Sequence, residues 1–378
     1  MDEPVYLDHH STTPCDPRVV EAMRPYFSEV FGNPSAITHE HGRRAATAVE
    51  DSRAAVASFF NVRPTEVFFT AGATESNNTV LFGMLAEGDH LITSAVEHKS
   101  ILEPVKELEK RGIEITVLPV DADGFVDPES VRDAIRGDTK LVSIIWANGE
   151  IGTIEPMADI AAICEERDVP FHSDATQAVG KVPVDLDSVP CRLLSLSAHK
   201  FYGPKGVGAL IARQGQKPKP FILGGGQEKR LRSGTVNVPG VVGLAEALDL
   251  RRTEMSAEAT KLTELRNRLW NSIVGSIEGS AVNGPRDQRL PGNLSVTFDR
   301  IGAEELMMAM RRFSLSSGSA CSSGSREPSS VLTAIGLDDA AALGTVRFGL
   351  GQSTDESAIL TLVEDLKSNV PRLRELSI

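Results

Sequence analysis

Hydrophobic and polar positions along the first two-thirds of the chain follow two alternating periods. Residues 40–60 repeat apolar side chains at helical spacing, and residues 17–30 show the same spacing. Short apolar runs of strand length come between the helical segments: 66–70, 90–94, 115–118, 141–147, 170–173, 193–196 and 207–212. This alternation predicts a mainly parallel sheet that is covered by helices on both faces.

The pattern changes near residue 250. Residues 244–274 are rich in Ala, Glu, Leu and Arg and predict one long helix, which is followed by strands at 293–298 and 344–350, a helix at 303–312 and a terminal helix from Asp355. We therefore expect an α/β protein with a large domain over residues 16–250, built on a mainly parallel seven-stranded sheet. A smaller α+β domain is expected over residues 1–15 and 251–378.

Composition and charge exclude several classes of protein. The 378 residues carry 39 Lys and Arg against 52 Asp and Glu, a net charge of −13, and only 5% of the residues are aromatic. Neither value favours a direct nucleic-acid partner. The chain begins without a signal-peptide pattern and has no apolar run near the ~20 residues of a membrane helix, so we expect a cytoplasmic protein with no membrane contact.

The four cysteines, Cys15, Cys164, Cys191 and Cys321, do not form a CxxC pair. Such spacing predicts neither a disulfide framework nor a structural metal site. Cys321 differs from the others because it lies in a run of Ser and Gly, SLSSGSACSSGS, which predicts a mobile loop over about 314–328. A thiol in such a loop is either reactive or accidental, and the pattern alone does not decide.

Lys200 follows an apolar run directly and precedes a glycine-rich turn, in SLSAHKFYGPKG. A lysine held inside a cleft at this point could act as a nucleophile toward an aldehyde, because burial lowers the pKa of its amine. A surface lysine in a loop would give the same pattern.

Two further segments could complete a site. Asp174 ends an apolar run, where α/β sheets bind ligands, and could pair with the ring nitrogen of pyridoxal phosphate (PLP) or simply cap a helix. Residues 71–78, AGATESNN, place small residues before a predicted helix. The start of that helix could bind one phosphate, although a plain strand-to-helix turn has the same composition.

Taken in order, these segments resemble the PLP-dependent cysteine desulfurases of the NifS/IscS type, within the fold-type I aminotransferase superfamily. The resemblance runs almost from end to end. It rests on YLDHHSTTP from Tyr6, FGNPS from Phe31, GATESNN from Gly72, EHK from Glu97, EIGT from Glu150, DATQ from Asp174, HKFYGPKG from His199, GGGQE from Gly224, RSGT from Arg232, SSGSACSS from Ser316 and VRFGLG from Val346.

The resemblance implies a role for each candidate residue. Lys200 would carry PLP and act as a base, His98 would lie against the ring and shuttle protons, and Cys321 would accept sulfur. Asp174 would hold the ring nitrogen, and Gln177 the ring hydroxyl. The remaining roles are phosphate or cofactor binding by Ala73, Thr74, Asn148, Ser197 and His199, a phosphate contact by Thr235 across a homodimer, and substrate-carboxylate binding by Asn33 and Arg347.

The implied reaction converts L-cysteine to L-alanine and leaves a persulfide on Cys321, which an acceptor protein then receives for iron–sulfur cluster assembly or thio-modification. The chain departs from the family pattern at Gly149, where an Asn that contacts the ring hydroxyl is usual. It also ends soon after the last predicted helix, so the extended tail that binds a scaffold protein in longer relatives is not expected. Alternatives are a transaminase, a selenocysteine lyase or an inactive relative. The Cys321 loop disfavours the first, and the intact site residues disfavour the last.

Overall fold

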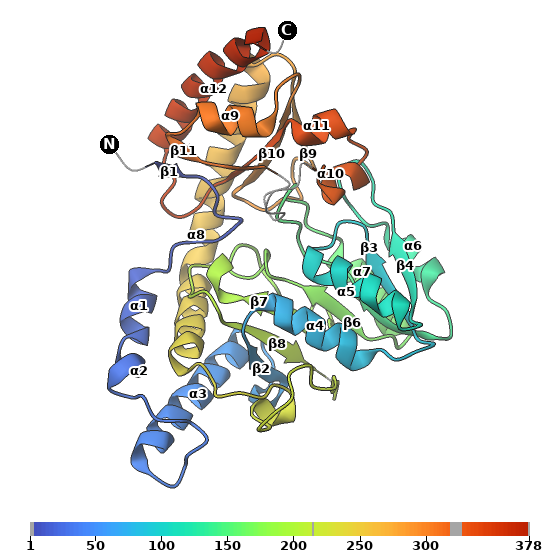
Figure 1. Ribbon diagram of the computed structural model, residues 1–378, viewed down its shortest axis with the longest axis vertical. Helices are drawn as coiled ribbons and strands as arrows, with labels where there is room; N and C mark the ends of the chain where they lie inside the picture. Colours follow the sequence, from blue (N-terminus) through green and yellow to red (C-terminus); the bar gives the residue numbers. More distant parts are fainter. Residues whose placement is uncertain (1–3, 214, 318–326, 377–378) are drawn as a thin grey trace.

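The computed structural model describes residues 4–213, 215–317 and 327–376. Its centre is a seven-stranded sheet with the order β2-β8-β7-β6-β5-β3-β4 (Figure 1). Only β8 is antiparallel to its neighbours, and the remaining pairs are parallel, as the apolar runs predict. The strands are β2 (Val67–Thr70), β3 (His90–Ser94), β4 (Glu114–Leu118), β5 (Thr139–Ser143), β6 (Phe171–Asp174), β7 (Leu193–Ser197) and β8 (Gly208–Ala212).

Both faces of this sheet are buried, which explains why the strands read as continuous apolar runs. Successive residues enter opposite cores: Leu193 packs with α4 and α5, whereas Leu194 packs with α3, α7 and the first half of α8. The helices on these faces are α3 (Glu40–Phe59), α4 (Ala73–Met84), α5 (Lys99–Lys110), α6 (Pro128–Ala134), α7 (Met157–Glu166) and α8 (Val238–Ser276).

A second, smaller sheet lies at the other end of the molecule, and its strand order is β12-β13-β10-β9. All its pairs are antiparallel, and a separate parallel pair joins β1 (Val5–Tyr6) to β11 (Phe313–Ser314). The remaining elements here are β9 (Ser280–Asn283), β10 (Asn293–Phe298), β12 (Ser316–Ser317), β13 (Thr345–Gly349), α9 (Ala303–Ala309), α10 (Ser330–Ala334), α11 (Asp339–Leu343) and α12 (Glu356–Leu376).

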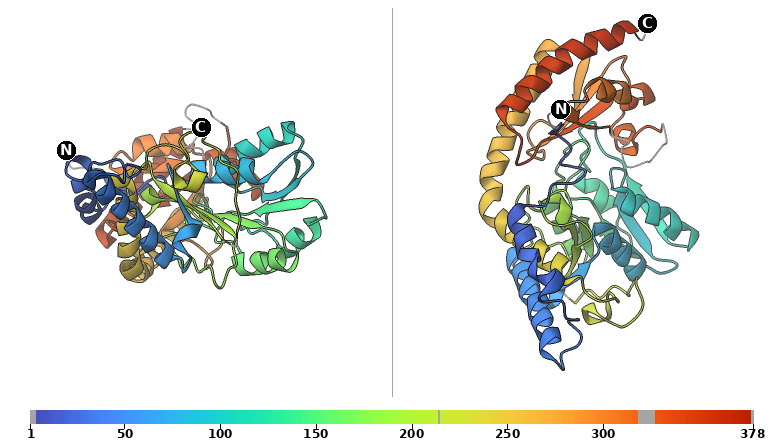
Figure 2. Two further views of the ribbon diagram at one scale, coloured as in Figure 1. Left: turned by 90° about the horizontal axis from the view of Figure 1, so that it is seen from below. Right: turned by 60° about the vertical axis from the view of Figure 1, so that its left-hand side comes forward.

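The long helix α8 connects the two parts (Figure 2). Its first half packs in the core beside the large sheet, and its second half packs in the core of the small sheet with α12. Domain boundaries near residues 15 and 250 stay a prediction. None of the helices within the described ranges has the length and apolar character needed to cross a membrane.

The helix predicted over residues 17–30 is in fact two helices, α1 (Pro17–Met23) and α2 (Pro25–Ser28). Pro25 separates them, because a proline has no backbone N–H and its ring blocks the preceding turn. The apolar run at 141–147 is likewise only partly a strand, since β5 ends at Ser143. After Ser143 the chain still runs alongside β6, because Ile144 N–H donates to the His172 carbonyl and Trp146 N–H to the Asp174 carbonyl.

Candidate active site

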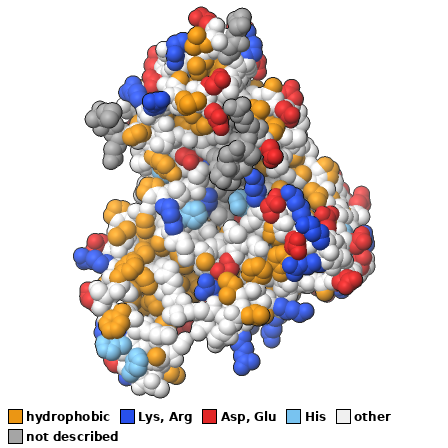
Figure 3. Space-filling model, in the orientation of Figure 1, with side chains coloured by type: hydrophobic (Ala, Val, Ile, Leu, Met, Phe, Trp, Pro, Cys, Tyr) orange, Lys and Arg blue, Asp and Glu red, His pale blue; other side chains and the backbone are white. Residues whose placement is uncertain are grey.

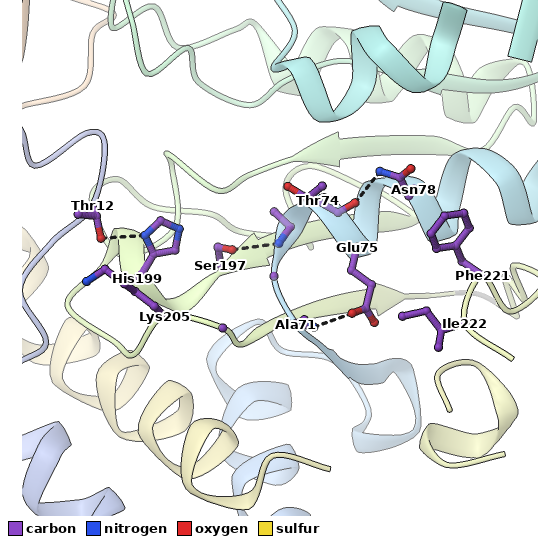
Figure 4. Close-up of a pocket in the computed structure, with 13 residues that line it drawn as sticks. Thr12, Ala71, Thr74, Glu75, Asn78, Ser197, His199, Lys205, Phe221 and Ile222 are labelled. Atoms are coloured by element: carbon purple, nitrogen blue, oxygen red, sulfur yellow. Dashed lines mark hydrogen bonds between the residues drawn. The ribbon is translucent and has the colours of Figure 1, made fainter. Parts of the chain in front are cut away.

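The candidate residues gather where β6 and β7 end, beside the start of α4 and the N-terminal segment at residues 8–13. A cavity of about 650 Å³ opens there, lined by residues of all these elements except β6 (Figure 4). In the space-filling view, histidine and basic side chains border the hollow between the two parts of the molecule (Figure 3). This is the carboxyl edge of the parallel strands, where sheets of this kind bind ligands.

The start of α4 forms one wall of the cavity and is built to bind an anion. Gly72 adopts a φ of +149°, which an L side chain rarely takes, and it turns the chain into the helix. Ala73 N–H donates to Ser197 Oγ at 2.9 Å. Thr74 also lines the cavity there. The exposed helix N–H groups and the positive end of the helix dipole favour a phosphate group.

His199 and Lys205 line the same cavity from the segment that follows β7. The His199 ring lies 3.0 Å from Thr12 Oγ1 through Nδ1. Burial, together with the positive charges of Lys200 and Lys205, lowers the pKa of His199 to about 4. The ring is therefore neutral near pH 7 and would bind a phosphate through an N–H rather than through a full charge.

Asp174 lies at the end of β6 and is the buried carboxylate of the site, with 3% of its surface exposed. Oδ2 accepts from Asn77 Nδ2 at 2.7 Å, and Oδ1 accepts from Thr176 N–H at 3.0 Å. Asn77 also donates to Ser100 Oγ, which lies 2.8 Å from His98 Nδ1. One hydrogen-bonded chain thus links Asp174 to His98.

His98 caps α5 through its ring, because Nδ1 accepts the Ser100 N–H at 3.1 Å. A neutral histidine that accepts at Nδ1 carries its proton on Nε2. The other edge of this exposed ring therefore presents an N–H, which suits a group that passes protons.

Lys200 ends the short helical turn after β7, beside the N-terminal segment. Its amine donates to the carbonyl oxygens of His10 and Ser11 at 2.8 and 2.7 Å. Carbonyl contacts of this kind hold an amine in place, yet they can be exchanged for a covalent bond without leaving a charge unpaired. The structure thus brings Lys200, Ser197 and His199 to one edge, as their positions in the sequence predict.

Arg347 enters the site from β13 of the small sheet. Its guanidinium donates to Asp8 Oδ1 at 2.8 Å, to Ser11 Oγ at 2.6 Å and to the Gly149 carbonyl at 3.2 Å. Nε is buried and makes no hydrogen bond with the described residues. A planar cation with a donor to spare fits the binding of a carboxylate.

Two other candidates, Asn33 and Thr235, do not line the cavity. The loop that carries Asn33 joins α2 to α3, at the end of the molecule opposite the small sheet that carries Arg347 (Figure 1). Thr235 is exposed in the segment before α8. Asn148 uses both ends of its side-chain amide on the backbone of residues 96, 150 and 151, which favours a structural role. Cys321 lies outside the described residues.

The surroundings of the Asp174 carboxylate show that the residues of the site could hold PLP. The buried Asp174 carboxylate receives only neutral donors, and among the described residues it forms no ion pair. A buried negative charge is costly unless a cation compensates it. A protonated pyridine nitrogen is such a cation, so Asp174 could hold the ring while the α4 wall binds its phosphate and Lys200 its aldehyde.

Several residues that build the site do not stand out in the sequence. Asn77 and Ser100 connect Asp174 with His98, and Asp8 and Ser11 hold Arg347. Asn77 lies inside the GATESNN segment, and Asp8 and Ser11 inside YLDHHSTTP, so the motifs marked the right segments. Which side chain of each motif enters the site depends on contacts between distant parts of the chain.

The comparisons with known proteins agree with this geometry. Residues 5–362 match the model of the family described as aminotransferase class-V. The chain is 46% identical to the cysteine desulfurase IscS of Dictyoglomus turgidum, over all of this chain and 97% of that protein. It is 44% identical to the mitochondrial cysteine desulfurase of Saccharomyces cerevisiae, over 99% of this chain and 76% of that protein.

Solved structures give the same picture. A NifS-like protein superposes with a TM-score of 0.91 at 35% identity, covering 98% of this chain and all of that one. SspA in complex with cysteine superposes with a TM-score of 0.82 at 38% identity, covering 92% of this chain and 98% of that one. The chain belongs to the aminotransferase class-V family and, within it, to the PLP-dependent cysteine desulfurases.

Proposed function

We propose that this protein removes sulfur from L-cysteine with PLP, releases L-alanine and passes the sulfur through Cys321. The observation that carries the proposal is the buried Asp174 at the end of β6, which forms no ion pair with the described residues. Lys200 follows the neighbouring strand β7, and the chain is 46% identical to a cysteine desulfurase. When PLP is bound, it supplies an electron sink that weakens the bonds at the α- and β-carbons of an amino acid.

The residues of the chain divide the remaining work. Arg347 binds the substrate carboxylate and so fixes the amino acid with its α-carbon toward Lys200. Lys200, once its amine is free, takes the α-proton, and the Nε2–H edge of His98 returns a proton to the product. Asp174 keeps the proton on the nitrogen of the PLP ring. The hydrogen bonds from Asp174 through Asn77 and Ser100 hold the imidazole of His98 in place.

The sulfur step balances with one thiol of the enzyme. The thiolate of Cys321 attacks the sulfur of L-cysteine, the carbon–sulfur bond breaks, and a sulfur–sulfur bond forms. The carbon gains a proton and leaves as alanine, so no external oxidant is needed. A reductant or an acceptor protein then takes the outer sulfur. We propose that this acceptor is a scaffold or sulfur-carrier protein and that the enzyme does not pass sulfur directly to a nucleic acid.

We further propose a homodimer in which Asn33 and Thr235 serve the site of the partner. Three large apolar side chains around the Asn33 loop, Phe27, Phe31 and Ile37, are 63–65% exposed. Exposed apolar groups gathered in this way are typical of an interface. Light scattering should give twice the chain mass. Mixed dimers of Asn33→Ala and Arg347→Ala should regain activity, because one site in each dimer has both groups intact.

The test of the function is the release of alanine and sulfide from L-cysteine, with PLP and a reductant, by the wild type and by Cys321→Ser. We expect equal amounts of both products from the wild type and neither from the variant. If Cys321→Ser matches the wild type, Cys321 is not the acceptor. If the wild type binds PLP and releases no alanine, the proposed reaction is wrong.

A further inference from the structure

The side-chain amide of Gln177 sits at the centre of a small polar cluster beside Lys200. Its Oε1 accepts from Lys181 Nζ at 2.6 Å and lies 3.1 Å from His10 Nδ1. Its Nε2 donates to the carbonyl of His10 at 2.9 Å. Lys200 donates to that same carbonyl. The NH₂ end of the amide therefore lies on the side of Lys200, and the oxygen end on the side of Lys181.

This orientation is enforced rather than arbitrary. The His10 carbonyl can only accept, so the end of the amide that faces it must be the donor, which leaves Oε1 to accept from Lys181. The reversed amide would set its NH₂ against Lys181 and its oxygen against the His10 carbonyl, with both favourable contacts gone. In the observed orientation His10 donates to Oε1 through Nδ1.

The charge around Lys181 is unusual for a lysine. Burial, together with the nearby cations Lys200 and Arg347, lowers its pKa well below the ordinary value, while Glu258 acts in the opposite direction. Such an amine is expensive to bury unless its contacts repay the loss of water. The contact to Gln177, at 2.6 Å, is shorter than the 3.5 Å contact between Lys181 Nζ and His10 Nδ1.

Gly149 closes the cluster on its other side. A Cβ atom at this position would lie 2.6 Å from Gln177 Nε2 and 2.9 Å from Gln177 Cγ. Real carbon contacts essentially never come so close, so any side chain at position 149 would displace the amide. The residue that departs from the usual family pattern thus provides the space that the Gln177 amide occupies.

We infer that Lys181 is a positioning residue of this site: it fixes the Gln177 amide with its NH₂ toward Lys200, ready to donate to the ring hydroxyl of PLP, in the space left by Gly149. The inference rests on the proposed function, because it assumes that PLP binds at Lys200. One amide held in a single orientation takes the place of the two amides that the family pattern uses.

Lys181→Met tests the inference, since methionine keeps the length of the side chain and removes the donor. With Lys181→Met we expect a changed absorption spectrum of the bound cofactor, and a dissociation constant for PLP raised about fivefold to tenfold, as the loss of one hydrogen bond predicts. The exposed Lys140→Met is the matched control and should behave as the wild type. A wild-type spectrum and affinity in Lys181→Met would overturn the inference.

A double-mutant cycle separates positioning from general damage. If Lys181 acts through Gln177, then adding Lys181→Met to Gln177→Ala should change neither the spectrum nor the affinity further. Effects that add in full would mean that Lys181 acts on its own, and the inference would be wrong.

Gly149→Ala displaces the same amide while it leaves Lys181 unchanged, so it keeps the test open if Lys181→Met does not fold. It should shift the spectrum in the same direction as Gln177→Ala, and an unchanged spectrum would contradict the inference. These outcomes differ from a failure of the proposed function. In that case the wild type itself would show no cofactor spectrum, or would release no alanine from L-cysteine.

Discussion

The side chain of Asn77 donates to Asp174 Oδ2 at 2.7 Å, and this amide is the link between the buried carboxylate and the His98 side of the site. Among the described residues Asp174 accepts only from neutral donors, so each donor helps to hold the carboxylate in position for the ring. Asn77→Ala should raise the dissociation constant of PLP about tenfold. Titration of the apoprotein with PLP, followed by absorbance, measures this. The exposed Asn271→Ala serves as the control and should leave the constant unchanged.

Arg347 is held by Asp8 and Ser11 in a position that a lysine could not reproduce. A lysine lacks the planar fork that binds a carboxylate through two parallel hydrogen bonds. We expect Arg347→Lys to raise KM for L-cysteine by about tenfold or more, with the affinity for PLP unchanged. Steady-state kinetics and PLP titration on the same sample separate the two effects. Equal losses in both would place Arg347 in the cofactor site instead.

Gly208 in β8 supports the phosphate wall from behind. A Cβ at this position would lie 2.3 Å from the Leu196 carbonyl oxygen and 2.7 Å from Gly72 Cα, both backbone atoms that cannot move aside cheaply. Gly208→Ala should lower the free energy of unfolding by about 2 kcal/mol and weaken PLP binding as well. Gly137→Ala is the matched control, because nothing lies within 4 Å of its Cβ. Urea unfolding of the two apoproteins gives the comparison, and similar values would contradict the prediction.

Glu155 gives the stability of the protein a defined pH dependence. Burial raises its pKa from 4.5 to about 8, even though Val126 N–H donates to Oε2. A carboxyl whose native pKa is raised binds its proton more tightly when folded. Its contribution to stability is therefore complete below about pH 4.5 and lost as the pH rises through about 8.

Glu155→Gln, which cannot ionise, should escape this loss. Above pH 8 we expect its free energy of unfolding to exceed that of the wild type by about 5 kcal/mol. Denaturation curves at a series of pH values test this. The exposed Glu264→Gln should follow the wild type at every pH, and a Glu155→Gln curve parallel to the wild type would show that Glu155 ionises without cost.

Much of the fold could be predicted from the sequence because the relevant information is local. The run at 90–94 is β3 without any shift, and the helix predicted over 40–60 is α3, since burial on one or both faces leaves a clear period. The break between α1 and α2 also has a local signal, which is Pro25 itself. β9 (Ser280–Asn283) has no such signal: it is short and half-buried, and only its pairing with β10 makes it a strand.

The sequence was enough to predict which segments form the site, but it was not enough to predict which side chains of those segments contact each other. Asp174 ends β6 and Lys200 ends the short turn after β7, and these positions place both at the ligand-binding edge. The contact between His10 and Gln177 joins residues 167 positions apart, and no periodicity in the chain encodes it. Asn148 was predicted to bind the cofactor, but its side-chain oxygen accepts from the backbone N–H groups of Glu150 and Ile151. These contacts form only when the chain folds into the turn.

The helix α8 has a consequence for how the protein can move and break. Its Leu244 and Leu248 belong to the core of the large sheet, while Leu265 and Leu269 belong to the core of the small sheet. A single helix of 39 residues, about 58 Å long, thus contributes side chains to both hydrophobic cores. Cleavage at any point of α8 would remove apolar side chains from one of the two cores. Limited proteolysis should therefore yield no stable fragment that corresponds to one half of the protein. The small sheet, which carries Arg347, is therefore joined to the large sheet by a continuous helix and not by a flexible linker.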